Sequence, residues 1–289
     1  AFMGNSTCIE SLVPFFDGDS SELARSASAI LSALATQTLV AIDQIMQLPD
    51  VPSRLIACVE SHPTEHYIAT HICIILEALM NFEDITFRYE LLEYGGLHAF
   101  CSAMDLHQTN ATTCRHACLV ITLLVPYING NLLGSLRSFV KTTFVPLLQV
   151  HLDNPETEAA VLDLLWAVGS MDEQQKWILL TDQNLQLIIQ AMACHLENDE
   201  LQRAGCGMLW FLSGFGDGKR MIGQAGGIPI ILNAMLAHNE STAIQKEALT
   251  TLKNLATEPF NKPILAELDC VRVVTYSLWI NYRHPLVIS

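Results

Sequence analysis

The chain has 289 residues, of which 51% are hydrophobic and only 7% aromatic, and its formal net charge is −15. This composition excludes a disordered chain and favours helices over a β-sandwich or barrel. The acidic balance argues against nucleic-acid binding, because basic residues occur singly apart from Lys219–Arg220 and form no stripe. No uninterrupted apolar stretch is long enough to cross a bilayer, so no membrane span is expected.

The first residues, AFMGNSTC, contain Gly4 and Cys8, which resemble parts of an acylation signal. Cys8 stands where a myristoylation signal needs Ser or Thr, so membrane anchoring through either residue is not expected. The chain has nine cysteines, mostly in apolar helical contexts. An odd number of such residues indicates reduced, buried thiols and a cytoplasmic protein.

From its beginning onward, the chain repeats a pattern with a period of about 44 residues. Each repeat has a short helical stretch, a glycine or polar break, an apolar helix ending in His, an acidic turn and a longer helix. Apolar residues recur at helical spacing in the longer helices AAVLDLLWAVGSM, RAGCGMLWFLSGF and KEALTTLKNLATE. The predicted repeats are 3–45, 46–93, 94–139, 140–181, 182–224 and 225–267, with a partial repeat at 268–289.

Glycine and proline mark the entry to the second helix of a repeat. The pair Gly95–Gly96 returns as Gly226–Gly227. Proline, which is tolerated in the first turn of a helix, is expected there at Pro14, Pro146 and Pro229. Because no repeat can bury its apolar helices alone, we expect one all-α solenoid over residues 1–289.

Residues 225–257, AGGIPIILNAMLAHNESTAIQKEALTTLKNLAT, resemble an armadillo repeat. They have a Gly-Gly-Ile-Pro entry, an acidic turn and an Ala-Leu-x-x-Leu-x-Asn-Leu-Ala third helix. Residues 182–213 share this resemblance, and 94–124 and 144–170 carry part of it. The resemblance implies a right-handed superhelix of about six repeats, whose third helices line a concave groove for extended peptides or partner proteins.

The third helices depart from the best-known armadillo grooves. Importin-alpha-like proteins carry a Trp and an Asn four residues apart in successive third helices. Here the Trp position reads Asp163, Gly207 and Thr250, and the Asn position reads Ala167, Phe211 and Asn254. Beta-catenin-like rows of Lys and Arg are missing too. We therefore expect neither nuclear-signal binding nor an acidic ligand, and the acidic surface favours a basic partner segment.

The resemblance places several residues in the predicted groove. Trp166 and Trp210 occupy equivalent positions in successive repeats, and large rings with a polar tip are typical binding anchors. Packing in the core is the alternative explanation for both rings. The full set of predicted groove residues is Asp163, Trp166, Trp210, Phe211, Thr250, Lys253 and Asn254.

One histidine recurs at the same place in five successive repeats. The row is His62, His107, His151, His195 and His238, at intervals of 45, 44, 44 and 43 residues, and His284 would extend it. Each ring could cap the C-terminus of its second helix, form a pH-responsive edge, or be a product of duplication. A metal site is not expected, because neighbouring helices lie about 8–10 Å apart while ligands of one ion lie about 2 Å from it.

Patterns that resemble enzyme motifs do not hold up. GFGDGK at 214–219 lacks the spacing of a phosphate-binding loop and a preceding strand, and is interpreted as a turn between repeats. Cys114 and Cys118 lie one helical turn apart, but no second ligand pair follows at zinc-site spacing. The sequence therefore predicts no catalytic residue, no metal and no cofactor.

The leading hypothesis is a cytoplasmic scaffold or adaptor whose concave groove holds an extended protein segment. The alternative is a regulatory or autoinhibitory armadillo module of a larger signalling protein, which senses a small ligand between repeats. The apolar end of the chain, HPLVIS, motivates that alternative.

Overall fold

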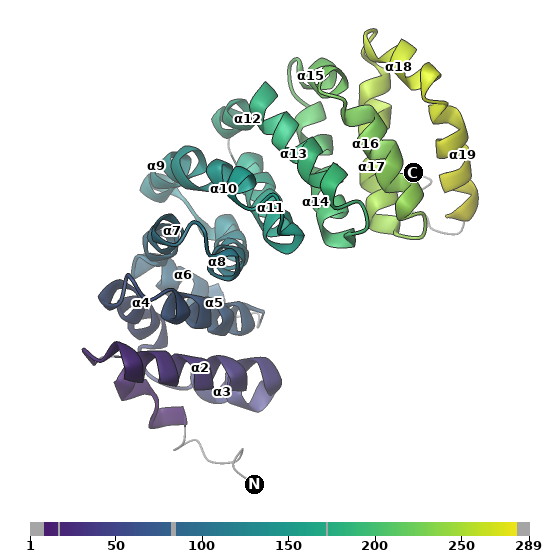
Figure 1. The fold of residues 1–289 in the computed structure, drawn as a ribbon. Coiled ribbons are helices and arrows are strands. Elements are labelled where there is room, and N and C mark those ends of the chain that lie inside the picture. The colour runs from purple at the N-terminus through teal and green to yellow at the C-terminus, as the bar shows by residue number, and fades with distance from the viewer. Residues whose placement is uncertain (1–8, 17, 82–84, 172, 282–289) are drawn as a thin grey trace. The chain divides into compact units, whose positions relative to one another are not determined.

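The computed structural model describes residues 9–16, 18–81, 85–171 and 173–281 of the chain (Figure 1). Within these ranges the chain forms helices joined by short turns, and no strand. It divides into two compact units, here called unit 1 (Ala1–Phe139) and unit 2 (Val140–Ser289). Gly4 and Cys8, at which the sequence resembles part of an acylation signal but acylation is not expected, lie outside the described residues.

Unit 1 contains helices in the order that the repeat pattern predicts. Its long third helices are α2 (Ser21–Gln37), α5 (His66–Met80) and α8 (Ala111–Leu124). The elements between and around them are η1 (Val13–Phe15), α3 (Leu39–Met46), α4 (Val51–Ser61), α6 (Ile85–Glu93), α7 (Gly96–Leu106), η2 (Val125–Tyr127) and α9 (Gly130–Phe139).

Unit 2 repeats the same order of short, medium and long helices. Its third helices are α11 (Pro155–Met171), α14 (Asp199–Ser213) and α17 (Thr242–Ala256). The other elements are η3 (Val140–Phe144), α10 (Val145–Val150), α12 (Glu173–Leu179), α13 (Asp182–Cys194), α15 (Gly218–Gln224), α16 (Gly227–Ala237), α18 (Asn261–Glu267) and α19 (Cys270–Ile280).

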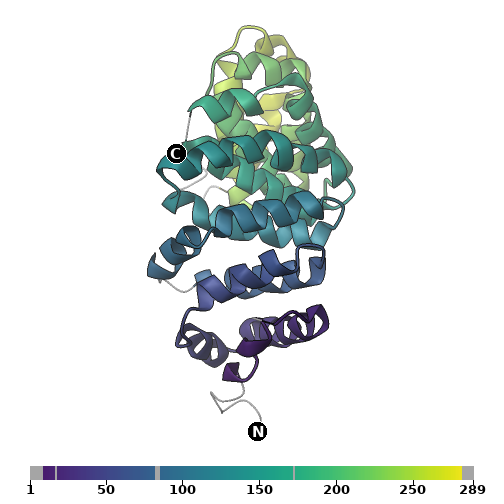
Figure 2. The same cartoon turned by 90° about the vertical axis from the view of Figure 1, so that its left-hand side faces the viewer.

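The third helices form the interior layer of each unit. In unit 1, α5 packs between α2 and α8, and in unit 2, α14 packs between α11 and α17, as the two views of the ribbon show (Figures 1 and 2). Apolar side chains of these helices are removed from water, for example Ile72 and Leu76 in α5 and Leu209 in α14. Burial of this kind is the main source of stability in repeat proteins, since each helix is covered by its neighbours.

Side-chain caps fix where the third helices begin. Asn110 accepts a hydrogen bond from the backbone N–H of Thr113, and Asn198 accepts one from that of Leu201. Asn154 caps α11 in the same way. Each cap satisfies a backbone donor that has no partner inside the helix.

The second helices begin at a residue in the left-handed region. Gly95 (φ 88°) and Gly226 (φ 85°) hold this position before α7 and α16, whereas Asp50 (φ 56°) and Asp269 (φ 50°) hold it before α4 and α19. Left-handed backbone favours glycine, so the two aspartates are conformationally strained.

The glycine that follows is required by close packing. A Cβ atom on Gly227 would lie 2.5 Å from Ile222 Cγ2, and one on Gly96 would lie 2.7 Å from the Leu91 carbonyl oxygen. In the repeated glycine pair, the first glycine thus allows the left-handed turn, and the second allows two helices to approach closely.

Proline stands in the opening turn of a second helix at Pro146 in α10 and at Pro229 in α16, as the sequence predicts. Pro52 does so in α4. Pro14 is different, because it lies in η1, a three-residue 3-10 turn closed by the bond from Phe16 N–H to the Val13 carbonyl.

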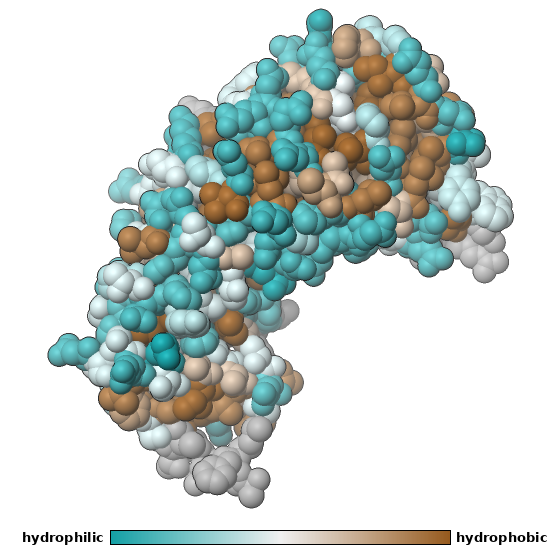
Figure 3. Space-filling model, in the orientation of Figure 1, coloured by the Kyte–Doolittle hydropathy of each residue, from teal (hydrophilic) through white to brown (hydrophobic). Residues whose placement is uncertain are grey.

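The visible surface of unit 2 carries apolar side chains over the region of α16 and α17, and a smaller apolar patch lies over α2 and α3 of unit 1 (Figure 3). In unit 1 the exposed side chains Leu23, Ile30, Leu39 and Val40 belong to α2 and α3. Among the described residues, no helix is both long and apolar enough to cross a membrane.

Candidate functional site

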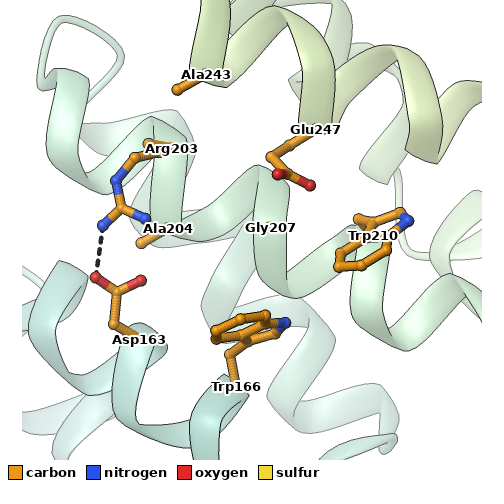
Figure 4. A pocket seen from close by; sticks show the side chains of 8 residues that line it. All are labelled: Asp163, Trp166, Arg203, Ala204, Gly207, Trp210, Ala243 and Glu247. Atoms are coloured by element: carbon orange, nitrogen blue, oxygen red, sulfur yellow. Dashed lines mark hydrogen bonds and ion pairs between the residues drawn. The ribbon is translucent and has the colours of Figure 1, made fainter. Parts of the chain in front are cut away.

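The third helices of unit 2 enclose a hollow of about 150 Å³. Asp163 and Trp166 reach it from α11, and Trp210 reaches it from α14. Figure 4 shows Asp163 and Arg203 on one side of the hollow, with Trp166 below and Trp210 on the other side. The residues that line it are Asp163, Trp166, Arg203, Ala204, Gly207, Trp210, Ala243 and Glu247.

An ion pair closes one side of the hollow. Arg203 Nη2 donates to Asp163 Oδ2 at 2.5 Å, which links α14 to α11. The hydrogen bond to Asp163 raises the pKa of the Arg203 guanidinium above its ordinary value. Because both side chains are partly exposed, we expect the pair to orient the helices more than to stabilise them.

Two indoles form the opposite side. Trp166 is 41% exposed and Trp210 is half-buried, so each offers part of its ring to the hollow. A serine about one helical turn after each Trp hydrogen-bonds to the helix backbone. Ser170 donates to the Trp166 carbonyl, and Ser213 donates to the Trp210 carbonyl. The rings therefore stand on ordered helix ends rather than on loops.

Small residues and one carboxylate form the floor and the far side. Gly207 leaves open space where a Cβ would stand, so the α14 backbone itself is the floor between the rings. The Glu247 carboxylate faces the hollow from α17, 3.8 Å from the exposed Lys246 ammonium. The hollow thus combines aromatic faces with a carboxylate whose ion pair, to the exposed Lys246, is longer than the pair between Asp163 and Arg203.

Two of the predicted groove residues are engaged elsewhere. Phe211 packs edge-on against Phe215, 5.0 Å between ring centroids, and lies where a Cβ on Gly169 would stand. It occupies the room that this glycine leaves in α11. Asn254 donates from its Nδ2 to Ser213 Oγ at 2.9 Å, so its amide joins α17 to α14.

The other two predicted groove residues do not line the hollow either. Thr250 returns its hydroxyl hydrogen bond to the Lys246 carbonyl at 2.8 Å, and Lys253 is exposed on α17. The structure therefore brings together Asp163, Trp166 and Trp210 and leaves Phe211, Thr250, Lys253 and Asn254 outside this hollow.

Sequence reasoning missed Arg203 and Glu247. Arg203 lies one helical turn before Gly207, which aligns with the Trp position of importin-alpha-like proteins, and Glu247 lies one turn before Thr250. A projection one turn back along each third helix would have found both.

The histidine row marks the C-terminal ends of the second helices. Each histidine of the row is the residue directly after a second helix. These are His62 after α4, His107 after α7, His151 after α10, His195 after α13 and His238 after α16. Three of the rings donate from Nε2 to a carbonyl in the preceding repeat: His107 to Pro63 (2.9 Å), His195 to Leu152 (2.7 Å) and His238 to Leu196 (2.7 Å).

In these three rings, Nε2 bonds to the preceding repeat and not to the ring's own helix. The acceptor is the residue directly after the preceding histidine of the row, so these rings fasten one repeat to the next. The sixth place is held by Asn281, which ends α19 and donates to the Asn239 carbonyl at 2.9 Å. His284, the predicted sixth member, lies outside the described residues.

A buried polar residue seven positions after the histidine completes two of these turns. Gln202 Nε2 donates to the carbonyls of Met192 (2.8 Å) and His195 (3.0 Å). Gln245 donates in the same way to Met235 (2.8 Å) and His238 (3.0 Å). Each amide thus donates to carbonyls at the C-terminus of the second helix, where the last carbonyl groups have no hydrogen-bond donor within the helix.

Unit 1 presents different chemistry on its third helices. His116 Nδ1 on α8 lies 3.0 Å from Glu77 Oε2 on α5, and Ser28 Oγ on α2 lies 3.3 Å from His71 Nδ1 on α5. Burial, reinforced by the charge of Arg25, lowers the pKa of His71. A hollow of about 380 Å³ beside Glu77 and His116 has otherwise mostly aliphatic walls.

Cations lie over aromatic rings along the first helices, a contact that sequence reasoning did not anticipate. Arg88 lies 5.2 Å from the ring centroid of Tyr127, and Lys176 lies 4.0 Å from that of Phe215. Arg220 lies 5.6 Å from that of Phe260. These are cation–π distances, and the three cations share one place in the repeat.

The cysteines in the described part of the chain lie in helices and are free thiols. Cys58, Cys73, Cys101, Cys114, Cys118 and Cys206 are buried, while Cys194 is exposed. Burial raises the pKa of both Cys114 and Cys206 to about 12, so these thiols stay protonated. In the part of the chain that the structure describes, no three Cys, His, Asp or Glu side chains gather as metal ligands would.

Comparison with known families identifies one repeat directly. Residues 217–257 match the armadillo/beta-catenin-like repeat family. The matched span contains α15, α16 and α17, the helix that carries Glu247. It supports the resemblance to armadillo repeats that the sequence shows in this part of the chain. No curated protein matches the chain.

Proposed function

We propose that this chain is a protein-binding scaffold that holds an extended partner segment on the third helices of unit 2. The observation that carries the proposal is the hollow with Trp166 and Trp210 on one side and the Asp163–Arg203 pair on the other (Figure 4). The match of residues 217–257 to a family of protein-binding repeats supports it. The right-handed superhelix and the continuous concave groove belong to the same proposal.

The size of the hollow suits one side chain. A cavity of about 150 Å³ holds a molecule as large as benzene, so a single side chain of a bound segment fits between the indoles. Aromatic residues that already have a fixed orientation lose little entropy on binding, which makes Trp166 and Trp210 effective anchors.

The charge of the hollow favours a basic segment. Asp163 is paired closely with Arg203, whereas the ion pair of Glu247 with the exposed Lys246 is longer, at 3.8 Å. The net charge of −15 would attract a cationic partner over longer distances and speed its association. The scaffold would act in the cytoplasm, by binding and not by catalysis, and without nucleic acid or cofactor as a partner.

The proposal is tested by selecting peptides from a random library on the intact chain and measuring their affinity by calorimetry. The double variant Trp166→Ala/Trp210→Ala should weaken the selected peptides roughly tenfold or more, because anchor residues of this kind dominate binding energy. Glu247→Gln should weaken basic peptides more than neutral ones.

Two further variants serve as controls. Trp279→Ala removes an indole that is 72% exposed on α19 and lies outside the hollow, so affinity should not change. Gly207→Leu fills the floor of the hollow and should abolish binding, while Gly134→Leu fills open space on α9 in unit 1 and should not. Equal affinities in the double variant and the unmodified chain would overturn the proposal.

A further inference from the structure

One buried acid in unit 2 has no hydrogen-bond partner among the described residues. Glu158 lies in the first turn of α11 and is 0% exposed. Neither Oε1 nor Oε2 has a donor in the part of the chain that the structure describes. An ionised carboxylate in such a place would carry a large desolvation penalty.

The repeat register gives this acid a clear counterpart. Glu158 stands seven residues after His151, as Gln202 stands after His195 and Gln245 after His238. Both glutamines donate from Nε2 to two carbonyls at the end of the preceding second helix. In the repeat that holds Glu158, the corresponding carbonyls are those of Leu148 and His151.

A carboxylate cannot take the place of an amide donor there. Its oxygens only accept hydrogen bonds, and they would face carbonyl oxygens that also only accept. A protonated carboxyl has one O–H and can donate to one of these carbonyls, as the amide does in the next two repeats.

We propose that the protonation state of Glu158 controls the stability of the turn between α10 and α11. The protonated carboxyl stabilises this turn, and its ionisation destabilises it. Because α11 also carries Asp163 and Trp166, the proton on Glu158 controls how firmly one wall of the hollow is held. This inference stands whether or not the hollow binds a protein.

Among the described residues of the neighbouring elements in unit 2, no cation is placed to hold the ionised form. On the neighbouring elements, Lys176 lies over the Phe215 ring, Arg203 is paired with Asp163, and Lys141 is exposed. The remaining titratable groups on α10, α11 and α14 are His151 at the end of α10, Glu156, the exposed acids Asp199 and Glu200, and the buried thiol of Cys206.

The direction of the pH effect follows from burial. Burial raises the pKa of Glu158 to about 8, from 4.5 in an unfolded chain. Protonated Glu158 therefore contributes its full share of stability below pH 4.5, and this share is lost as the pH rises through 8. The acid makes unit 2 weaker in mildly alkaline solution.

The experiment compares thermal unfolding of the intact chain and of Glu158→Gln between pH 5 and pH 9. The variant carries an amide donor at every pH, as Gln202 and Gln245 do. Its melting temperature should exceed that of the unmodified chain by an amount that grows by roughly 5–10 °C between pH 6 and pH 9. A constant difference, or a variant less stable at all pH values, would overturn the proposal.

Two matched variants distinguish the local effect of Glu158 ionisation on stability from a general effect of charge. Glu156→Gln removes the same charge from an exposed position on the same helix, and should leave the pH dependence of the melting temperature unchanged. Gln202→Glu places an acid in the next turn and should add a second loss of stability at high pH. If Glu156→Gln reproduces the effect of Glu158→Gln, the effect is not local and the proposal fails.

A direct titration keeps the proposal testable even if a variant folds poorly. NMR of the unmodified chain with ¹³C-labelled glutamate carboxyl groups should reveal one carboxyl that titrates far above the others. That resonance should be missing in Glu158→Gln. Titration of every glutamate in the ordinary range would contradict the proposal.

Discussion

Units 1 and 2 share one scaffold and differ in the surface it presents. In both, a side chain at the end of a second helix donates to a backbone carbonyl of the preceding repeat, as His107 does in unit 1 and His238 in unit 2. On the third helices, however, unit 1 places Glu77 where unit 2 places Trp166 and Trp210. The two units therefore share the contacts that join their repeats, whereas the residue types on their third-helix faces differ.

The largest test of the shared scaffold concerns the second glycine of the entry turn. Gly96→Ala in unit 1 and Gly227→Ala in unit 2 should each destabilise the chain by about 1–3 kcal/mol, because the new methyl meets atoms that lie too close. Urea unfolding measures both. Gly134→Ala, where a Cβ would meet open space, is the control and should cost nothing. A large effect in only one unit would mean that the scaffolds are not equivalent.

A second test breaks the row between repeats. His195→Ala should cost about 1–2 kcal/mol, because it removes the donor to the Leu152 carbonyl and leaves that oxygen unpaired. His107→Ala should cost a similar amount in unit 1. His195→Asn should recover part of the loss, because Asn281 performs this role at the end of α19. The same free energy of unfolding for His195→Asn and His195→Ala would show that the donor is unimportant.

A third test uses the strained entry residues. Asp50→Gly should stabilise unit 1 by about 0.5–1 kcal/mol, because glycine adopts the left-handed conformation at no steric cost. Asp269→Gly should gain less, since it also removes the exposed ion pair with Arg272, 3.1 Å apart. Thermal unfolding of both variants measures the difference. A loss of stability in Asp50→Gly would show that the aspartate has a role beyond its backbone angle.

The smallest expected effect concerns the third-helix faces. Asp163→Asn should change the free energy of unfolding by only about 0.2–1 kcal/mol, because the ion pair with Arg203 is partly exposed. Glu77→Gln should have a similarly small effect in unit 1, where the partner is His116. The Asp163→Asn effect should be smaller at high salt than at low salt, because salt screens exposed charges. An effect above 2 kcal/mol would make the pair a structural element and not a surface feature.

The sequence predicted the helices of the chain. It aligned Asp163, Trp166 and Trp210 in successive third helices, and the structure brings these three side chains around one hollow. Phe211 and Asn254 lie outside this hollow, for physical reasons that a pattern does not contain. Gly169 leaves room for the Phe211 ring, and Ser213 accepts the Asn254 amide.

The partners of the histidine row could not be predicted in the same way. The pattern showed that the residue recurs, but its acceptor is a main-chain atom with no sequence signature. The same applies to Glu158, which reads as one of several acids in the segment DNPETE. Its burial becomes visible only when the helices are packed.

The row of hydrogen bonds between repeats has a consequence for how such a chain can change. The acceptors belong to Pro63, Leu152, Leu196 and Asn239, four residues with three different chemical characters, yet each offers the same backbone oxygen. A change of side chain at these four sites does not remove the acceptor atom, because that atom belongs to the backbone. A duplicated repeat can therefore form these hydrogen bonds without matching side-chain changes in its neighbour. The exposed faces of the repeats can diversify while the hydrogen bonds between repeats are kept.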